Sequence, residues 1–222
     1  MIEGIRIYIE GGGDHRDTRA ALRFGFGEFF KSLREKARHK NMRWSITVCG
    51  TRRFAFNAFC EALRSRSESF CILLVDSESS VSQTPWEHLL KRDSWLNPGA
   101  GDEHCHLMVQ TMETRLIADR QALERFYGQN FNTNRIPATE DVETIEKASL
   151  EPALKEATRR TQKGEYHKTR HGPKILEMLD YTGVCEKAHY CRRLFDTLTR
   201  VLDGELELKN LREILQHALC RI

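Results

Sequence analysis

The chain has 222 residues and a net charge of only +3, with 40% hydrophobic and 30% charged residues. This length is enough to bury a sizeable core, as one domain or as a domain with a smaller appendage. No apolar run is long enough to span a bilayer, so we expect a cytoplasmic protein with no membrane partner. The small net charge excludes a polycation, so any affinity for nucleic acid has to come from local clusters of basic residues.

The 7 cysteines are odd in number and scattered, and no two form a CxxC pair. This usage favours buried, reduced thiols over a disulfide framework. His104 and His106 could offer two imidazoles on one face of a strand. Because no matching pair of ligands occurs elsewhere, zinc is not favoured there.

The first half of the sequence alternates between apolar runs and segments with helical spacing. Strands are expected over residues 5–10, 44–50, 70–79 and 104–110. Helices are expected over residues 18–40, 51–65, 85–95 and 112–128, and Asp14 or Asp17 could cap the first of them. Apolar runs separated by helices predict a parallel sheet covered on both faces, so residues 1–127 are expected to form an α/β domain.

The second half is expected to be helical, over residues 146–161, 171–179 and 187–204, with Gly204 as a C-cap. We expect residues 128–222 to form a helical C-terminal region packed on the α/β domain. The last segment, residues 207–222, is amphipathic, and packing on its own domain is favoured over contact with a partner.

Acidic residues follow two of the expected strands at the point where each strand ends. Glu10 ends the first strand and Asp76 the third, with Glu78 two residues further on. Strands of a parallel α/β sheet end at the same edge, so these residues are expected to share it. On extended chain Asp76 and Glu78 project from the same face, and the three side chains could converge. The alternative, that they are helix caps or solvated turn residues, stays open.

Three carboxylates at close range repel one another, and a bound divalent cation removes that repulsion. Oxygen ligands favour Mg²⁺ or Mn²⁺ over zinc. Such an ion can orient and polarise a phosphodiester, with Glu10 the first choice for general base or acid. The pattern therefore predicts a catalytic metal centre formed by Glu10, Asp76 and Glu78.

Three glycines, Gly11, Gly12 and Gly13, directly follow Glu10. A dinucleotide-binding loop reads GxGxxG, and a P-loop ends in GK followed by Ser or Thr. Here Asp14 and His15 come next, with no lysine at the required place. We therefore interpret the glycines as a sharp turn that keeps bulk away from Glu10, not as a phosphate cradle.

A strand ending in EG, followed by a helix and a later strand ending in an acid-x-acid pair, resembles the Toprim fold. Topoisomerases, DnaG-type primases and the nucleases named for overcoming lysogenization defect share that fold. In detail the chain resembles a family of small bacterial Toprim-like proteins of largely undetermined function. The stretches that carry the resemblance are IRIYIEGGGD, ILLVDSE, PWEHLLKRDSW, HCHLMVQTMETRLIADRQALERFYG and KGEYHKTRHGPKILEMLD.

The resemblance implies that Glu10 is the Toprim glutamate and that Asp76 and Glu78 are the acid-x-acid pair. Many Toprim proteins have aspartate in place of Glu78, which leaves open whether Glu78 binds the ion directly or through water. The implied fold is a Toprim-like, mostly parallel sheet flanked by helices. The implied function is a metal-dependent nuclease on DNA or RNA, the effector of an anti-phage defence system that acts with an ATPase partner.

Two other functions stay open. One is a non-catalytic regulatory or binding subunit of an ATPase-containing complex. The other is a metal-dependent phosphoryl transfer on a nucleotide, which the missing P-loop disfavours. The sequence also leaves a homo-oligomer possible.

Further candidates lie outside the three acids. Glu113 follows the fourth strand and could supply another outer metal ligand, with helix capping as the alternative. The segment 155–174 is the most basic part of the chain, and Gly164 and the Gly172-Pro173 turn favour a loop there. Its expected nucleic-acid contacts are Arg159, Arg160, Lys163, Lys168, Arg170, His171 and Lys174.

One lysine of this segment, Lys168 or Lys174, is expected to stabilise the reacting phosphate, as the resemblance to Toprim nucleases suggests. Tyr166 could stack on a base or belong to the core. For Trp86 and Trp95, packing of the short helix between them is favoured over base stacking.

Overall fold

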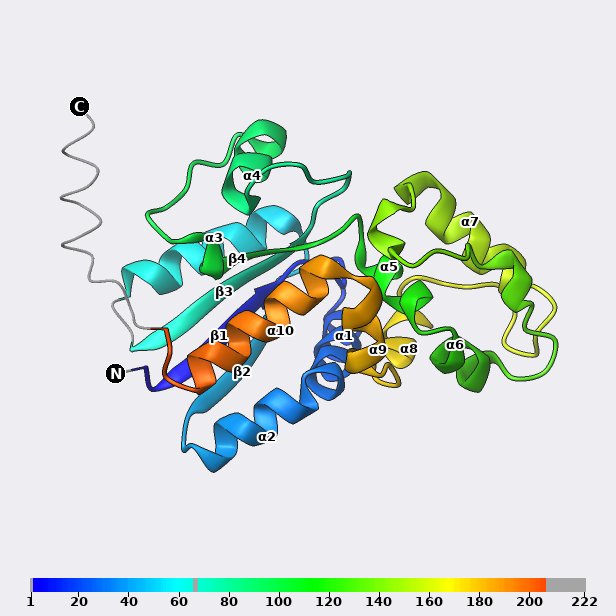
Figure 1. The fold of residues 1–222 in the computed structure, drawn as a ribbon, viewed down its shortest axis with the longest axis horizontal. Helices are drawn as coiled ribbons and strands as arrows, with labels where there is room; N and C mark the ends of the chain where they lie inside the picture. Colours follow the sequence, from blue (N-terminus) through cyan, green and yellow to red (C-terminus); the bar gives the residue numbers. More distant parts are fainter. Residues whose placement is uncertain (1, 66–67, 207–222) are drawn as a thin grey trace.

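A computed structural model describes residues 2–65 and 68–206 (Figure 1). Within these ranges, four strands form one sheet, in the order β2-β1-β3-β4, with every neighbouring pair parallel. The strands are β1 (Gly4–Ile9), β2 (Arg43–Val48), β3 (Ser69–Asp76) and β4 (Cys105–Met108). The prediction of an α/β fold with a parallel sheet is confirmed.

The central strand β3 shows why the sheet must be covered on both faces. All eight of its residues are buried. Phe70, Ile72 and Leu74 face one hydrophobic cluster, and Cys71, Leu73 and Val75 face the other. Side chains of a strand alternate between faces, so a continuous apolar run requires an apolar layer on each side.

Helices from both ends of the described chain cover the first face (Figure 1). They are α1 (Arg16–Phe29), α2 (Lys31–His39) and α10 (His189–Leu202). Phe29 of α1 meets Phe195 of α10 edge to face, with ring centroids 5.4 Å apart. The C-terminal helical region therefore shares its core with the α/β unit.

The second face is covered by α3 (Arg52–Arg64) and α4 (Pro85–Asp93). Trp86 and Trp95 are buried in this layer, and Trp95 stacks on Phe56 with ring centroids 4.3 Å apart. The expectation that both tryptophans belong to the core is confirmed.

The remaining helices include a group that lies beyond the carboxyl ends of the strands (Figure 1). They are α5 (Met112–Ala118), α6 (Arg120–Tyr127), α7 (Lys147–Thr158), α8 (Gly172–Leu176) and α9 (Tyr181–Lys187). Single turns of 3₁₀ helix, at Asp102–His104, Thr133–Arg135 and Val142–Thr144, connect the elements. None of the described helices is both long enough and apolar enough to cross a membrane.

Several helix ends differ from their expected positions. The helix predicted over residues 18–40 is two helices, because the chain breaks at Phe30. The one predicted over residues 112–128 breaks at Asp119, whose side chain caps α6 by accepting from the N–H of Ala122. Neither Asp14 nor Asp17 caps α1, since the residue at that position is His15.

The C-terminal end of α10 follows the prediction closely. Gly204 comes directly after the capping residue Asp203 and has a φ of +76°. The N–H of Glu205 donates to the carbonyl of Arg200 at 2.9 Å, which completes a Schellman turn. The amphipathic segment expected at residues 207–222 lies outside the described residues.

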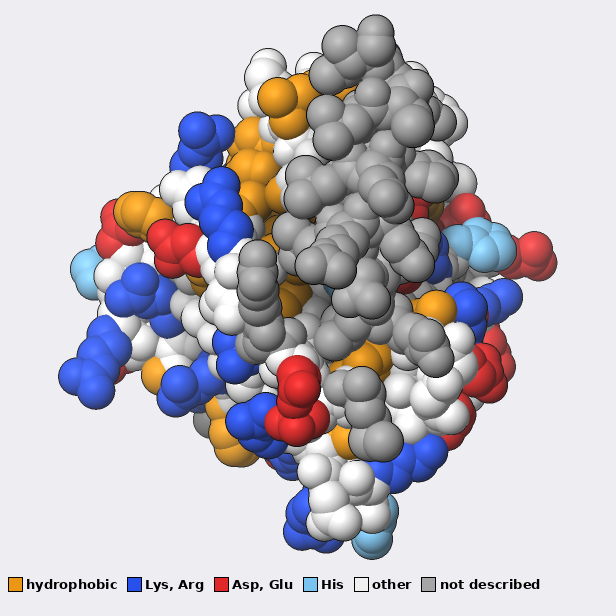
Figure 2. Space-filling model, turned by 90° about the vertical axis from the view of Figure 1, so that its left-hand side faces the viewer, with side chains coloured by type: hydrophobic (Ala, Val, Ile, Leu, Met, Phe, Trp, Pro, Cys, Tyr) orange, Lys and Arg blue, Asp and Glu red, His pale blue; other side chains and the backbone are white. Residues whose placement is uncertain are grey.

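Figure 2 views the molecule from the side at which the strands begin. Basic and acidic side chains are interspersed on the part of this side that is not drawn in grey (Figure 2). Mixed charge of this kind keeps a surface solvated and gives no strong field of one sign. The concentration of charge that matters for the site is at the opposite end of the strands.

The glycine turn after β1 is required by helix α1. Gly11, Gly12 and Gly13 all have positive φ, at +132°, +78° and +56°. A Cβ on Gly12 would lie 2.9 Å from the Cα of Arg19, and a Cβ on Gly11 would lie 2.6 Å from Leu22. The sharp turn is confirmed, and a side chain at Gly11 or Gly12 would strike α1.

We therefore expect Gly12→Ala to lower the free energy of unfolding by about 2–4 kcal/mol, because it adds backbone strain to an overlap with the backbone of α1. The matched control is Gly13→Ala, which also has positive φ but meets no atom within 4 Å. Gly13→Ala should cost only about 1 kcal/mol. Urea denaturation measures both, and equal losses would contradict this explanation of the turn.

Candidate metal centre

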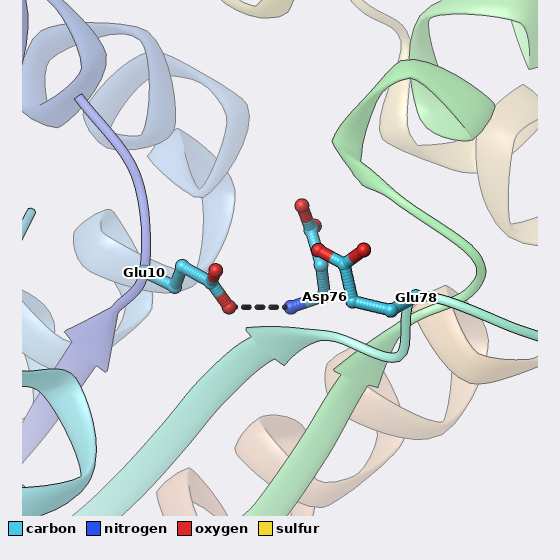
Figure 3. Close-up of side chains that lie close together, drawn as sticks. All are labelled: Glu10, Asp76 and Glu78. Atoms are coloured by element: carbon cyan, nitrogen blue, oxygen red, sulfur yellow. Dashed lines mark hydrogen bonds between the residues drawn. The ribbon is translucent and has the colours of Figure 1, made fainter. Parts of the chain in front are cut away.

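Glu10 stands between the two central strands. It directly follows β1, and its backbone N–H donates to the carbonyl of Leu74 in β3 at 3.0 Å. One carboxylate oxygen, Oε2, accepts from the backbone N–H of Asp76 at 3.2 Å (Figure 3). The side chain of Glu10 is thereby aimed across the end of the sheet toward β3.

Asp76 is the last residue of β3 and is only 7% exposed. Its Oδ1 atom is buried and has no hydrogen-bond partner among the described residues. A buried carboxylate oxygen without a partner is costly, and native proteins seldom retain one without a use.

The three predicted acids do meet. Glu10, Asp76 and Glu78 each place a carboxylate oxygen so that all three atoms lie within 4.8 Å of one another. In Figure 3 the side chains of Asp76 and Glu78 rise from the end of β3 opposite that of Glu10. Within the described residues this is the one group of His, Cys, Asp and Glu side chains arranged to hold a metal ion.

The reason given above for the placement of Glu78 is wrong. Glu78 has a left-handed backbone, with φ at +68°, so it does not continue the extended strand. Its N–H donates to the carbonyl of Gln110 at 2.8 Å, and that of Ser77 donates to Met108 at 3.0 Å. Hydrogen bonds to the end of β4 and to the chain that follows it therefore hold Glu78 where its side chain meets the other two acids.

Arg52 fixes the back of the site, and the sequence interpretation missed it. Its Nη1 donates to Oε2 of Glu10 at 3.0 Å and to the backbone carbonyl of Asp76 at 2.6 Å. Nε and Nη2 form a two-pronged ion pair with Asp93 at 3.1 and 2.7 Å. The guanidinium also lies over the ring of Trp95, 5.2 Å from its centroid. The sequence feature that could have indicated Arg52 is its position as the first residue of a helix that follows the end of a strand.

Glu78 is held by two further cations that the sequence interpretation missed. Lys147 of α7 forms an ion pair and hydrogen bond with its Oε2, and Arg92 of α4 lies 3.9 Å from the same oxygen. Burial by itself would raise the pKa of Glu78, but Lys147, Arg92 and Arg52 outweigh burial and lower it.

The other two acids have raised pKa values. Burial raises the pKa of Glu10, although Arg52 opposes the shift. Burial, together with the negative charge of Glu10, raises the pKa of Asp76 to about 8, although Lys168 opposes the shift. A divalent cation would reverse both effects, because it favours the ionised carboxylate.

Glu113 is buried near the site but is not one of the three acids that meet. Its carboxylate accepts from the hydroxyl of Tyr166 at 3.1 Å and from Nζ of Lys168 at 3.3 Å. Glu113 therefore holds Lys168, and its role as an outer metal ligand stays a prediction. Tyr166 is 2% exposed and belongs to the core, so base stacking by Tyr166 is excluded.

The predicted nucleic-acid contacts of the basic segment differ in their exposure and in their distance from the acids. Lys168 lies close enough for its charge to act on Asp76, whereas Lys174 is exposed on α8 and has no such contact. His171 is buried, and its Nδ1 lies 3.0 Å from the hydroxyl of Tyr127. The prediction of His171 as a nucleic-acid contact is corrected on this ground. The candidates that are exposed are Arg159, Arg160, Lys163, Lys168, Arg170 and Lys174.

The two histidines of the fourth strand are also structural. His106 is fully buried, with Nε2 3.1 Å from the carbonyl of Glu103 and Nδ1 3.1 Å from Arg193. Nδ1 of His104 lies 2.7 Å from the carbonyl of Cys71. Both rings are thus engaged with the protein.

Residues 9–199 match a protein family described as a domain of unknown function (DUF4276). The chain belongs to this family. No curated protein and no solved structure matches the chain significantly. The part that matches DUF4276 contains all three acids of the site and the whole basic segment, but its description names no activity. Function therefore has to be argued from the geometry of this DUF4276 chain.

The raised pKa of Asp76 gives a test of its burial. In the folded protein Asp76 keeps its proton up to about pH 8, whereas the unfolded chain loses it near pH 4. The stability that the neutral carboxyl contributes is complete below pH 4 and is lost as the pH rises to 8. In EDTA, Asp76→Asn should therefore melt about 3–8 °C above the wild type at pH 8, with little difference at pH 4.5.

The matched control is Asp203→Asn. Hydrogen bonds from Lys36 and Lys40 lower the pKa of Asp203, so its stabilisation is present at neutral pH and lost in acid. This variant should melt slightly below the wild type at pH 8. A difference for Asp76→Asn that stays constant from pH 4.5 to 8 would contradict the raised pKa.

Proposed function

We propose that the protein is a metal-dependent phosphodiesterase, a nuclease that uses Mg²⁺ or Mn²⁺ to cleave DNA or RNA. The observation that carries the proposal is the unpartnered, buried Oδ1 of Asp76 within a group of three carboxylates. These oxygens suit a hard cation, which in such sites orients and polarises a phosphoryl group.

The chain's own residues would divide the remaining work. Glu10 has Oε2 anchored by Arg52 and by the N–H of Asp76, which leaves Oε1 for an ion or a proton. A carboxyl with a raised pKa suits general acid or base chemistry near neutral pH. Lys168, placed by Glu113, would stabilise negative charge on the reacting phosphate. Burial lowers the pKa of its ammonium, but Glu113 and Asp76 outweigh burial and raise it, so Lys168 stays charged.

The exposed cations of the basic segment would hold the substrate backbone. They lie after the end of α7, on the chain that returns from the far end of the helical group toward the sheet, except Lys174, which is on α8 (Figure 1). Arg160 and Arg170 are exposed there, as are Lys163 and Lys174. Contacts of this kind are independent of sequence and weaken with salt.

By its resemblance to Toprim nucleases, the protein would act in anti-phage defence with an ATPase partner. A second candidate function is a non-catalytic regulatory subunit of such a complex. The observation that favours it is the set of cations already bound to the acids, namely Arg52, Arg92 and Lys147, which could balance the site without turnover.

Cleavage assays decide between the two functions. The assays contain Mg²⁺ or Mn²⁺, and the protein is tested alone and with an ATPase encoded by a neighbouring gene. The wild type should cleave DNA or RNA. Glu10→Gln and Asp76→Asn should each lower the cleavage rate at least ~100-fold. The control is Glu35→Gln, which removes an exposed acid on α2. Cleavage by Asp76→Asn at the wild-type rate would exclude the proposed centre, and absence of cleavage under every condition would favour the regulatory function.

The two candidate lysines give a second, finer test. Lys168→Ala should lower kcat by about 100-fold, because the variant loses the cation placed beside Asp76. Lys174→Ala, which also removes one lysine of the basic segment, should change kcat less than about threefold. Equal effects on kcat would contradict the assignment of Lys168.

A further inference from the structure

We infer that the divalent cation and an anionic phosphodiester bind this site cooperatively, each raising the affinity for the other. The inference rests on the proposed function and adds to it how the site is filled. It follows from the charges that surround the three acids and from their contacts.

The described residues at the site form one connected network of charges. Its acids are Glu10, Asp76, Glu78, Asp93 and Glu113, and its bases are Arg52, Arg92, Lys147 and Lys168. With every group ionised, as a bound divalent cation favours, the five acids and four bases themselves carry a formal charge of −1. One divalent cation changes the charge to +1, and one phosphodiester group returns it to neutral.

The same contacts put protein cations in competition with a metal ion. Arg52 already binds Oε2 of Glu10, and Lys147 already binds Oε2 of Glu78. An ion that takes Glu78 as a ligand therefore weakens the contact of Lys147 and adds positive charge beside it. For this reason the ion alone should bind weakly.

A phosphodiester removes that obstacle. The side chains of Lys147 and Lys168 are 46% and 51% exposed, so both ammonium groups are accessible to a ligand. Phosphate oxygens could accept from these lysines as the ion takes the carboxylates. Because linkage is reciprocal, the ion must raise phosphodiester affinity by the same factor.

The test measures Mn²⁺ binding to the full chain by titration calorimetry and electron paramagnetic resonance. The ligands are DNA and RNA oligonucleotides with nuclease-resistant phosphorothioate linkages, and the control is the same sequence with uncharged methylphosphonate linkages. We expect the anionic DNA or RNA to lower the Kd for Mn²⁺ at least ~10-fold, and the uncharged one to change it less than twofold.

Lys147→Gln probes the competition directly. It should tighten the binding of Mn²⁺ alone about fivefold and reduce the effect of the oligonucleotide. Lys40→Gln is the control, since Lys40 is similarly exposed at 42% but follows the end of α2 and pairs with Asp203, which follows the end of α10. If the Arg52→Gln variant folds, it should change Mn²⁺ binding in the same way as Lys147→Gln. If it does not fold, Lys147→Gln alone still tests the competition.

The outcomes separate this inference from the proposed function. Mn²⁺ that binds equally well with and without oligonucleotide, in a protein that cleaves, would overturn the cooperativity alone. Failure to bind Mn²⁺ under either condition would overturn both. Tighter binding with the charged oligonucleotides only, reduced in Lys147→Gln and kept in Lys40→Gln, supports the inference.

Discussion

The burial of the Asp76 carboxyl is the constraint on which the rest of the site depends. Strand β3 is buried along its whole length, and it ends on an acid that has one oxygen without a partner and Glu10 beside it. Such an arrangement disfavours the ionised carboxylate and lowers the stability of the folded chain. A bound cation would convert this unfavourable arrangement into a binding site, and for this reason we propose that the three acids form a metal centre.

The neighbouring cations explain how the chain tolerates these acids. Arg52 is fixed by Asp93 and Trp95, so it presents one Nη to Glu10 with little freedom. Lys147 and Lys168 come from the helical group beyond the sheet and are half exposed. Arg52 thus orients the acids of the site. Lys147 and Lys168 are placed where an anionic ligand could bind them.

The sequence was sufficient for the architecture and for the meeting of Glu10 and Asp76, but not for Glu78, whose left-handed backbone departs from the extended strand. Apolar runs such as residues 70–75 require a doubly covered parallel strand, and the ends of parallel strands bring Glu10 and Asp76 to one edge. The partners could not be predicted, because Lys147 lies 69 residues from Glu78 in the chain. His171 shows the opposite error: its basic neighbours suggest a surface residue, but Tyr127 and Phe126 bury it.

The most direct test of the central claim is anomalous diffraction from a crystal soaked in Mn²⁺. The proposed centre predicts a single strong peak within about 2.5 Å of Oδ1 of Asp76 and of an oxygen of Glu10. Glu78 should bind the same ion directly or through water. Absence of a peak between Asp76 and Glu10 at saturating Mn²⁺, with the acids still held by Arg52 and Lys147, would contradict it.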